Sequence, residues 1–478
     1  MNDTPALGLS TPSWADPPPP RLRLLAGALL CAVPAAFLLA DTAFGINVPV
    51  IAYLIAATVL MSRPSRTEGH TWSGVVLTVI ALLLSTVAVL RASEWLVVGC
   101  ILASATLAAT VALGTRTWKT LLATGFLFGE ATFRAIPWAA ATGRRHRPRR
   151  LPLRAPASVF SGLVTGLVCA AIVGALLASA DAGFAQVLSD VGGWFVLDVP
   201  SSDVIAARII TFGVVTLFVL GLGFAASSPL RHAPDAPGDR HPAEWLVPLV
   251  LVTLTIAAFL AVDATRLFGA GPAVPDSTHA ERAREGFGQL IVVTVLVLLL
   301  IGWAGRSAAP RHRHLLAAGG GPLLALTLLL AFSALRRLWL YMSEFGWTVT
   351  RFNAGAFELW VVGVLALVGG TWLARRTDLL PRLTAGSAGL GLLVVALAGP
   401  DAVVAAADVR RYERTGDIDV LYLSRLSPDA IPALSKLPDD VLPCALPRLP
   451  DDQPWYSWNL SRSRADSRSD RPAQCLRD

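Results

Sequence analysis

The chain alternates between long apolar stretches and short polar segments, and at least ten of the stretches have the length of a membrane span. A bilayer's hydrocarbon core is about 30 Å thick, so a helix crosses it in roughly 20 residues. Backbone groups in hydrocarbon find no water to bond, which makes these stretches helices. We predict an all-α, polytopic membrane helix bundle of about 11 transmembrane helices, within a range of roughly 10 to 13. The predicted spans are residues 24–40, 44–61, 74–90, 95–113, 159–178, 204–225, 245–262, 287–304, 322–340, 354–373 and 383–397.

One further segment, residues 118–141, is moderately apolar but carries Lys119, Glu130 and Arg134. On a helical wheel these charges cluster beside an apolar face. That face holds Leu122, Phe126, Phe133 and Ile136. As a twelfth span, the segment would move the arginine-rich loop that follows it to the opposite side of the membrane. We therefore predict an interfacial or re-entrant helix on the cytoplasmic side.

The loops between the spans differ in charge, and this difference predicts the orientation. Lys and Arg collect in cytoplasmic loops. The arginines of one side are Arg63, Arg66, the run from Arg144 to Arg154, Arg306, Arg311, Arg313, Arg375, Arg376 and Arg382. On the other side, residues 179–203 hold four aspartates and no basic residue. We predict a cytoplasmic N-terminus and a C-terminal tail outside.

Composition excludes a large soluble domain, because 54% of the residues are hydrophobic and 15% are charged, against about 25% charged in soluble chains. The six arginines from Arg144 to Arg154 are typical of a cytoplasmic loop beside anionic lipid, and we expect no nucleic-acid partner. The first apolar run lacks a cleavage motif and is interpreted as an uncleaved helix. We expect a disordered, Pro-rich cytoplasmic N-terminus at 1–20, a transmembrane bundle at 21–400 and an extracytoplasmic tail at 401–478.

The tail carries signals for short helices and ends in a segment of disordered composition. Residues 417–438 predict two brief helices, with Ser427 as an N-cap and Pro428 at the first helical position. Cys444 and Cys475 lie in this tail. If the tail is outside, the two cysteines either form a disulfide that closes a loop of about 30 residues or remain as unpaired thiols.

The candidate site residues lie in two loops that the predicted orientation puts outside. Arg337, Tyr341 and Glu344 stand at i, i+4 and i+7, so a helix presents them on one face, and Arg351 and Glu358 open the next span. This set is either a polar ligand-binding site between helices or an ion-pair cluster that ties a hairpin together.

Glu281 and Arg284 have the same two interpretations, since a pair at i, i+3 also stabilises a helix start. Asp263 is interpreted as marking the membrane interface.

No catalytic, metal or cofactor motif accompanies these residues. His312 and His314 alternate with arginines, whose charge repels a cation, and no third ligand is near. The run Gly319 to Gly321 lacks the Lys and Ser/Thr that complete a phosphate-binding loop. We therefore assign no catalytic residue, no metal and no cofactor.

Three motifs in order resemble the DUF4153/DUF4173 families, multi-pass bacterial membrane proteins with a domain of unknown function. The motifs are Thr-His-Ala-Glu-Arg-Ala-Arg-Glu-Gly-Phe at 278–287, the segment 335–348 followed by Arg351, and Leu-Tyr-Leu with Asp-Ala-Ile-Pro-Ala-Leu within 421–434. The resemblance covers about residues 150–437 and implies a bacterial cytoplasmic membrane protein without an assigned activity. This chain departs from the family pattern at His279, Arg282, Phe345 and Trp347.

These observations favour a non-enzymatic membrane protein that works at its outer face. Its expected partners are the lipid bilayer and an extracytoplasmic or envelope protein. Two alternatives stay open, a secondary transporter and a membrane-embedded enzyme that acts on a lipid or cell-wall precursor.

Overall fold

The computed structural model describes most of the chain as helix, and the statements below concern these described residues. They are 13–14, 17–18, 20–62, 72–145, 202–228, 230–231, 238–267, 279–449 and 453–465. The predicted span at 159–178 and the arginine run that precedes it lie outside them, apart from Arg144 and Arg145. The chain divides into two compact units. The N-terminal unit holds Thr11–Arg231 and Pro450–Arg464, and the C-terminal unit holds His232–Leu449 with both chain ends.

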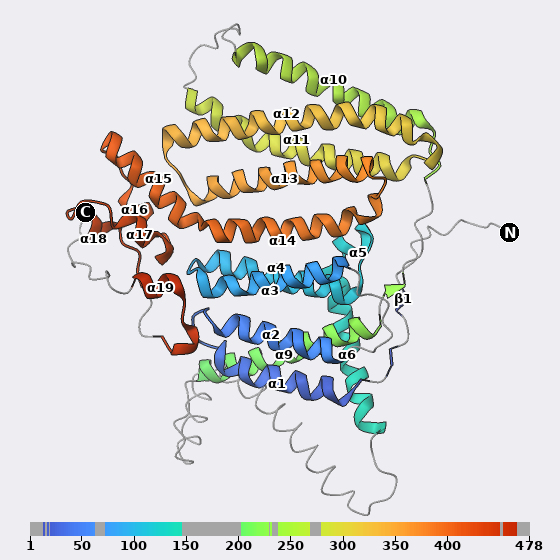
Figure 1. Cartoon of the computed structure of the whole chain (residues 1–478), viewed down its shortest axis with the longest axis vertical. Helices are drawn as coiled ribbons and strands as arrows, with labels where there is room; N and C mark the ends of the chain where they lie inside the picture. The colour runs from blue at the N-terminus through green and yellow to red at the C-terminus, as the bar shows by residue number, and fades with distance from the viewer. Residues whose placement is uncertain are drawn as a thin grey trace, which may run out of the picture. The chain divides into compact units, whose positions relative to one another are not determined.

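Five long helices of the N-terminal unit lie side by side (Figure 1). They are α1 (Leu22–Leu38), α2 (Asn47–Ser62), α3 (Trp72–Leu90), α4 (Glu94–Leu113) and α9 (Ser202–Ser227). The core that α1, α2, α4 and α9 share is built from small and branched residues such as Ala32, Ala112 and Val219, which let the helices approach closely. A two-residue antiparallel pair joins β1 (Ser13–Trp14) to β2 (Leu230–Arg231).

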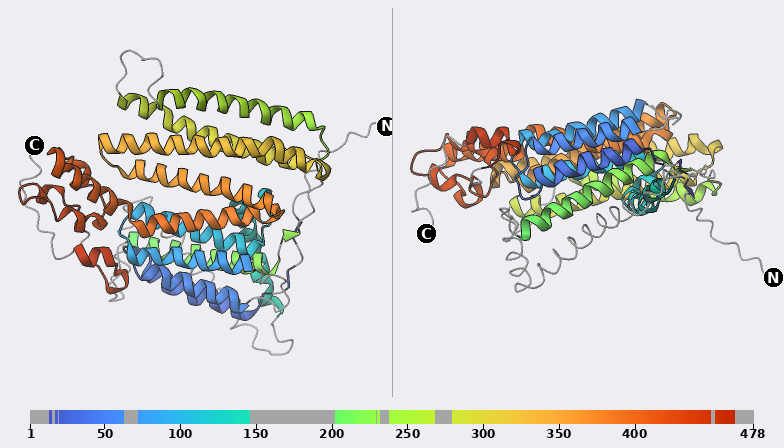
Figure 2. Two further views of the ribbon diagram at one scale, coloured as in Figure 1. Left: turned by 45° about the horizontal axis from the view of Figure 1, so that its top comes forward. Right: turned by 90° about the horizontal axis from the view of Figure 1, so that it is seen from below.

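Residues 118–141 form two helices, α5 (Trp118–Leu122) and α6 (Thr124–Arg145). The views in Figures 1 and 2 agree that α6 runs across the direction of the other helices of its unit rather than along them. It packs on α9 through Leu127, Ala131 and Ala135. The side chains of Phe126 and Phe133 on its other face are 78% and 76% exposed. This geometry suits a helix at the membrane surface, and the interfacial placement stays a prediction.

The C-terminal segment returns to the N-terminal unit as η4 (Trp455–Ser457) and α19 (Leu460–Ala465). Asn459 holds it in place, because its Nδ2 donates to the carbonyls of Ala88 and Arg91, both at 2.7 Å. Arg462 Nη2 also donates to the carbonyl of Phe44 at 2.8 Å. The α1–α2 and α3–α4 turns therefore lie at the end of the unit that the tail covers.

The C-terminal unit places five long helices in antiparallel succession (Figure 1). They are α10 (Pro242–Leu267), α11 (His279–Ser307), α12 (Arg313–Phe345), α13 (Val349–Leu373) and α14 (Leu380–Ala398), with η1 (Pro310–His312) and η2 (Thr377–Leu379) in the turns. Trp245, Leu249, Ile301 and Leu323 form the main core cluster of α10, α11 and α12.

The tail then folds into short helices beyond the ends of α13 and α14. They are α15 (Pro400–Thr415), α16 (Val420–Leu423), η3 (Pro428–Ala430), α17 (Ile431–Leu434) and α18 (Leu442–Ala445). Pro428 occupies the first helical position as predicted, whereas Ser427 makes no side-chain cap hydrogen bond. We call residues 400–449 the tail cap.

The helices confirm the polytopic, all-α class. Among the described residues, eight helices are long and apolar enough to cross a membrane, and α1 and α2 are shorter apolar helices. These ten correspond to ten of the eleven predicted spans, and the eleventh lies outside the described residues.

Candidate functional site

The turn between α12 and α13 is closed by Arg351. Its Nη1 donates to the carbonyl of Gly346 at 2.7 Å, and its Nη2 donates to the Tyr341 hydroxyl at 3.2 Å. The guanidinium also stacks over the Tyr341 ring, 4.4 Å from the centroid. Thr348 caps α13 by accepting the N–H of Arg351. Arg351 therefore satisfies carbonyls at the end of α12 and fixes the turn.

The tail cap binds this same turn through two hydrogen bonds. The N–H of Trp347 donates to Asp408 Oδ1 at 3.0 Å. The N–H of Val349 donates to the Tyr422 hydroxyl at 2.8 Å. The second and third sequence motifs, far apart along the chain, thus contact each other at the start of α13.

The third motif forms the interior of the tail cap. Leu423, Ala430 and Leu434 are buried in one cluster with Val404 and Val409 of α15. The hydroxyl of Ser427 donates to Asp401 and to Asp429, both of which are buried. These motif residues stabilise the folded tail cap, which is part of the C-terminal unit.

Burial dominates the electrostatics of the contact between turn and cap. It raises the pKa of the Asp408 carboxyl, against the lowering effects of the Trp347 N–H and of the Arg411 and Arg351 charges. Burial likewise raises the pKa of the Tyr422 phenol, which the Val349 N–H partly offsets. In both groups, burial shifts the balance towards the neutral form relative to the same group in water.

Arg337 pairs with a residue of another helix. Its Nη2 lies 2.5 Å from Asp263 Oδ1 of α10, and Ser333 Oγ donates to Asp263 Oδ2 at 2.6 Å. Its guanidinium lies 5.9 Å from the Phe259 ring centroid. Asp263 is only 9% exposed, so it is the buried acid of an ion pair between α10 and α12 rather than the interface marker that we expected.

The predicted cluster is thus divided among different partners. Tyr341 and Arg351 contact each other, while Arg337 belongs to the pair with Asp263. Glu344 is exposed, and no ion pair or hydrogen bond joins its side chain to another described residue. Glu281 and Arg284 lie in α11, and their side chains are outside the part of the structure that is described.

Glu358 is a feature whose environment the sequence interpretation missed. It lies inside α13, its side chain is 0% exposed, and neither carboxyl oxygen has a hydrogen-bond partner among the described residues. The sequence did contain an indication, because Glu358 is the one ionisable residue in the predicted span 354–373 and such residues within spans are commonly functional.

The described cysteines fall into two groups. Cys31 and Cys100 are free and buried, whereas Cys444 is disulfide-bonded. Its partner lies outside the described residues, which leaves Cys169 and Cys475 of the five cysteines. The Cys444–Cys475 pairing stays a prediction.

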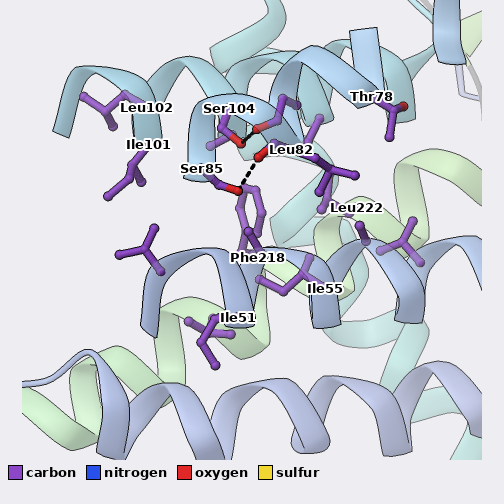
Figure 3. Close-up of a pocket in the computed structure, with 18 of the residues that line it drawn as sticks. Ile51, Ile55, Thr78, Leu82, Ser85, Ile101, Leu102, Ser104, Phe218 and Leu222 are labelled. Carbon is purple, nitrogen blue, oxygen red and sulfur yellow. Dashed lines mark hydrogen bonds between the residues drawn. The ribbon is translucent and has the colours of Figure 1, made fainter. Parts of the chain in front are cut away.

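The N-terminal unit contains a cavity of about 420 Å³ between α2, α3, α4 and α9. Figure 3 shows Ile51, Leu82, Ile101 and Phe218 around it. Its hydroxyls are occupied by backbone carbonyls, as for Ser85 with Leu82 and for Ser104 with Ala81. The cavity therefore suits an apolar group and offers no charge for catalysis. Within the described part of the chain, no cluster of His, Cys, Asp and Glu could hold a metal ion.

Comparison with known proteins identifies one family. The model described as "Domain of unknown function (DUF4153)" matches residues 78–437. This confirms the resemblance to DUF4153 and extends it towards the N-terminus, from about residue 150 to residue 78. The three motifs all lie after residue 277, whereas the additional match at 78–150 falls mostly on apolar helices with little distinctive sequence. No curated protein and no solved structure matches the chain.

Proposed function

The chain belongs to the DUF4153 family, and from that premise we propose a non-enzymatic membrane protein whose tail cap binds a partner in the cell envelope. The folding of the tail cap onto the α12–α13 turn is the observation that supports this proposal. Trp347 and Val349 hold the cap against the end of α13 by hydrogen bonds to Asp408 and Tyr422. A rigid extramembrane surface loses little conformational entropy when it binds.

The proposal includes a bacterial cytoplasmic membrane with the tail cap outside. In the C-terminal unit, the cap and the α12–α13 turn lie at one end of the helices, and Arg306, Arg311 and Arg375 lie at the opposite end. Basic loops favour the cytoplasm. A disulfide at Cys444 is also consistent with an oxidising compartment.

Photo-crosslinking tests the partner. A photoreactive residue replaces Leu421, an apolar side chain on the cap that is 64% exposed, and the control replaces the exposed Arg375 at the opposite end. We expect position 421, but not position 375, to give a discrete crosslinked protein. The substitution Leu421→Glu should reduce the amount of this protein that co-purifies with the chain. The absence of a protein crosslink from position 421 and from other exposed cap positions contradicts the proposal.

Reporter fusions test the orientation separately. Fusions after Arg145 and Leu460 should report the cytoplasm and the outside respectively, and a fusion after Asp190 should report the outside. The reverse pattern overturns the outward tail without affecting the fold.

A secondary transporter is the second candidate, and Glu358 is the observation that favours it. Unpaired ionisable groups inside membrane helices commonly mark proton or ion pathways. The enzyme alternative has less support, because the guanidinium groups of Arg337 and Arg351 are both already engaged by protein groups.

A further inference from the structure

Glu358 is buried well inside a membrane helix, and its carboxyl group has no hydrogen-bond partner among the described residues. It is the tenth residue of α13, which puts it about 14 Å along the helix from its first residue. Its side chain is 0% exposed, and neither Oε1 nor Oε2 is hydrogen-bonded to a described residue. A buried polar group without a hydrogen bond is rare in native proteins and calls for a specific explanation.

Glu358 lies on the side of α13 that packs against α12. Gly355 and Gly369 lie at i−3 and i+11 on that side, and a Cβ added to them would meet Leu338 and Leu324 of α12 at 3.1 and 3.0 Å. Glu358 is therefore held between two close contacts of the helices.

The charged groups of the neighbouring helices are engaged elsewhere or lie at helix ends. On α12, Arg337 pairs with Asp263 and Arg336 is exposed. On α15, Asp401 bonds Ser427 and Asp408 bonds the N–H of Trp347. Other ionisable groups of these helices lie near helix ends, such as Glu344 in the last turn of α12, Arg382 in the first turn of α14 and Arg306 in the last turn of α11.

An ionised carboxylate in such a site loses its hydration without gaining a counter-charge, which costs far more than taking up a proton. We propose that Glu358 is a proton-binding site within the membrane, occupied as a neutral carboxylic acid in the resting protein. The site is independent of partner binding by the tail cap, and it supplies the transporter alternative with a carboxyl that gains and loses a proton.

An apolar carbodiimide, dicyclohexylcarbodiimide, tests the protonated carboxyl directly. The acid gives its proton to a carbodiimide nitrogen while its oxygen adds to the central carbon, and the O-acylisourea rearranges to a stable N-acylurea with no atom lost. Peptide mass spectrometry of the full-length protein in detergent should find the adduct on Glu358 at mildly acidic pH. We expect its yield to fall at alkaline pH, and Glu358→Gln to remove it.

Glu344 is the matched control, because its carboxyl is exposed at the end of α12. A water-soluble carbodiimide with an amine nucleophile should modify Glu344 and leave Glu358 unmodified. If the apolar reagent leaves Glu358 unlabelled at every pH while the water-soluble reagent labels Glu344, the proposal is overturned. A thermal stability of Glu358→Gln far below that of wild type also contradicts it, because the amide mimics a neutral acid and not an ionised, paired carboxylate.

Discussion

The hydroxyl of Tyr422 accepts a hydrogen bond from the backbone N–H of Val349 at 2.8 Å and joins the tail to the first residue of α13. The N–H groups in the first turn of a helix lack intrahelical acceptors. The Tyr422 hydroxyl therefore supplies an acceptor that α13 itself does not provide. The bond connects two segments that the family resemblance had marked only as separate motifs.

Removing this acceptor should weaken the attachment of the tail cap. Tyr422→Phe leaves the Val349 N–H unsatisfied, at an expected cost of about 1–3 kcal/mol. Thermal unfolding in detergent and hydrogen exchange at the start of α13 measure the change. Tyr412→Phe is the control, since Tyr412 packs in the same cluster and its hydroxyl bonds no described residue. Equal stabilities of the two variants would contradict the role of the bond.

Gly346 should tolerate no side chain. Its φ of 82° and ψ of 166° fall in a region that essentially only glycine adopts. A Cβ there would also lie 3.1 Å from Arg411 Nη1 and 3.3 Å from Asp408 Oδ1. We expect Gly346→Ala to cost about 1–3 kcal/mol in free energy of unfolding.

Gly363→Ala provides the comparison for this substitution. Gly363 lies inside α13 with open space around its missing Cβ, and alanine has the higher helix propensity by about 1 kcal/mol. The prediction fails if both variants change the midpoint of unfolding equally.

The Asp408 carboxyl should make stability depend on pH. Burial raises its pKa, so the folded protein binds this proton more tightly than the unfolded chain does. The contribution of this group to stability is complete below its ordinary pKa and is lost as the pH rises through the raised value. Asp408→Asn keeps an oxygen for the Trp347 N–H and should flatten this dependence, as measured by unfolding across acidic pH.

Asp417→Asn changes an exposed side chain and is the control, so its free energy of unfolding should depend on pH as in the wild type. A wild-type pH dependence in Asp408→Asn refutes the assignment.

The ion pair between Arg337 and Asp263 should show strong coupling. Arg337→Gln leaves Asp263 buried without its counter-charge, for which a loss of about 3–5 kcal/mol is typical. Replacing both groups, as in Asp263→Leu with Arg337→Met, should recover most of that loss because no buried charge remains. A double-mutant cycle in detergent measures the coupling.

Arg336→Gln serves as the neighbour control, since Arg336 is exposed and surface changes usually stay within about 0.5 kcal/mol. Additive effects of the two substitutions in the pair would show that Asp263 and Arg337 do not depend on each other.

Asn459 should govern the docking of residues 453–465 on the N-terminal unit. It is 1% exposed and donates to the carbonyls of Ala88 and Arg91. Asn459→Ala removes both bonds and should increase protease cleavage of this segment several-fold. Ser463→Ala removes an exposed hydroxyl that, among the described residues, bonds the Leu460 carbonyl within the same helix, and it should leave the cleavage rate unchanged.

The candidate site could be predicted only in part. The spacing of Arg337, Tyr341 and Glu344 indicated a common helix face, because side chains at i, i+4 and i+7 project in similar directions. Spacing does not say which neighbouring helix faces each residue. Asp263 is 74 residues from Arg337, and its role depends on the packing of α10 against α12.

By itself the sequence determined the class of the protein, ten of its apolar helices and its family resemblance. These properties follow from local chemistry, because an apolar stretch of membrane length can satisfy its backbone only as a helix. Tertiary structure alone decided that Tyr422 reaches Val349, that Arg337 pairs with Asp263 and that the buried carboxyl of Glu358 bonds no described residue. Such contacts depend on which helix faces meet, and the free energy of packing that selects them is a property of the whole unit rather than of any one segment.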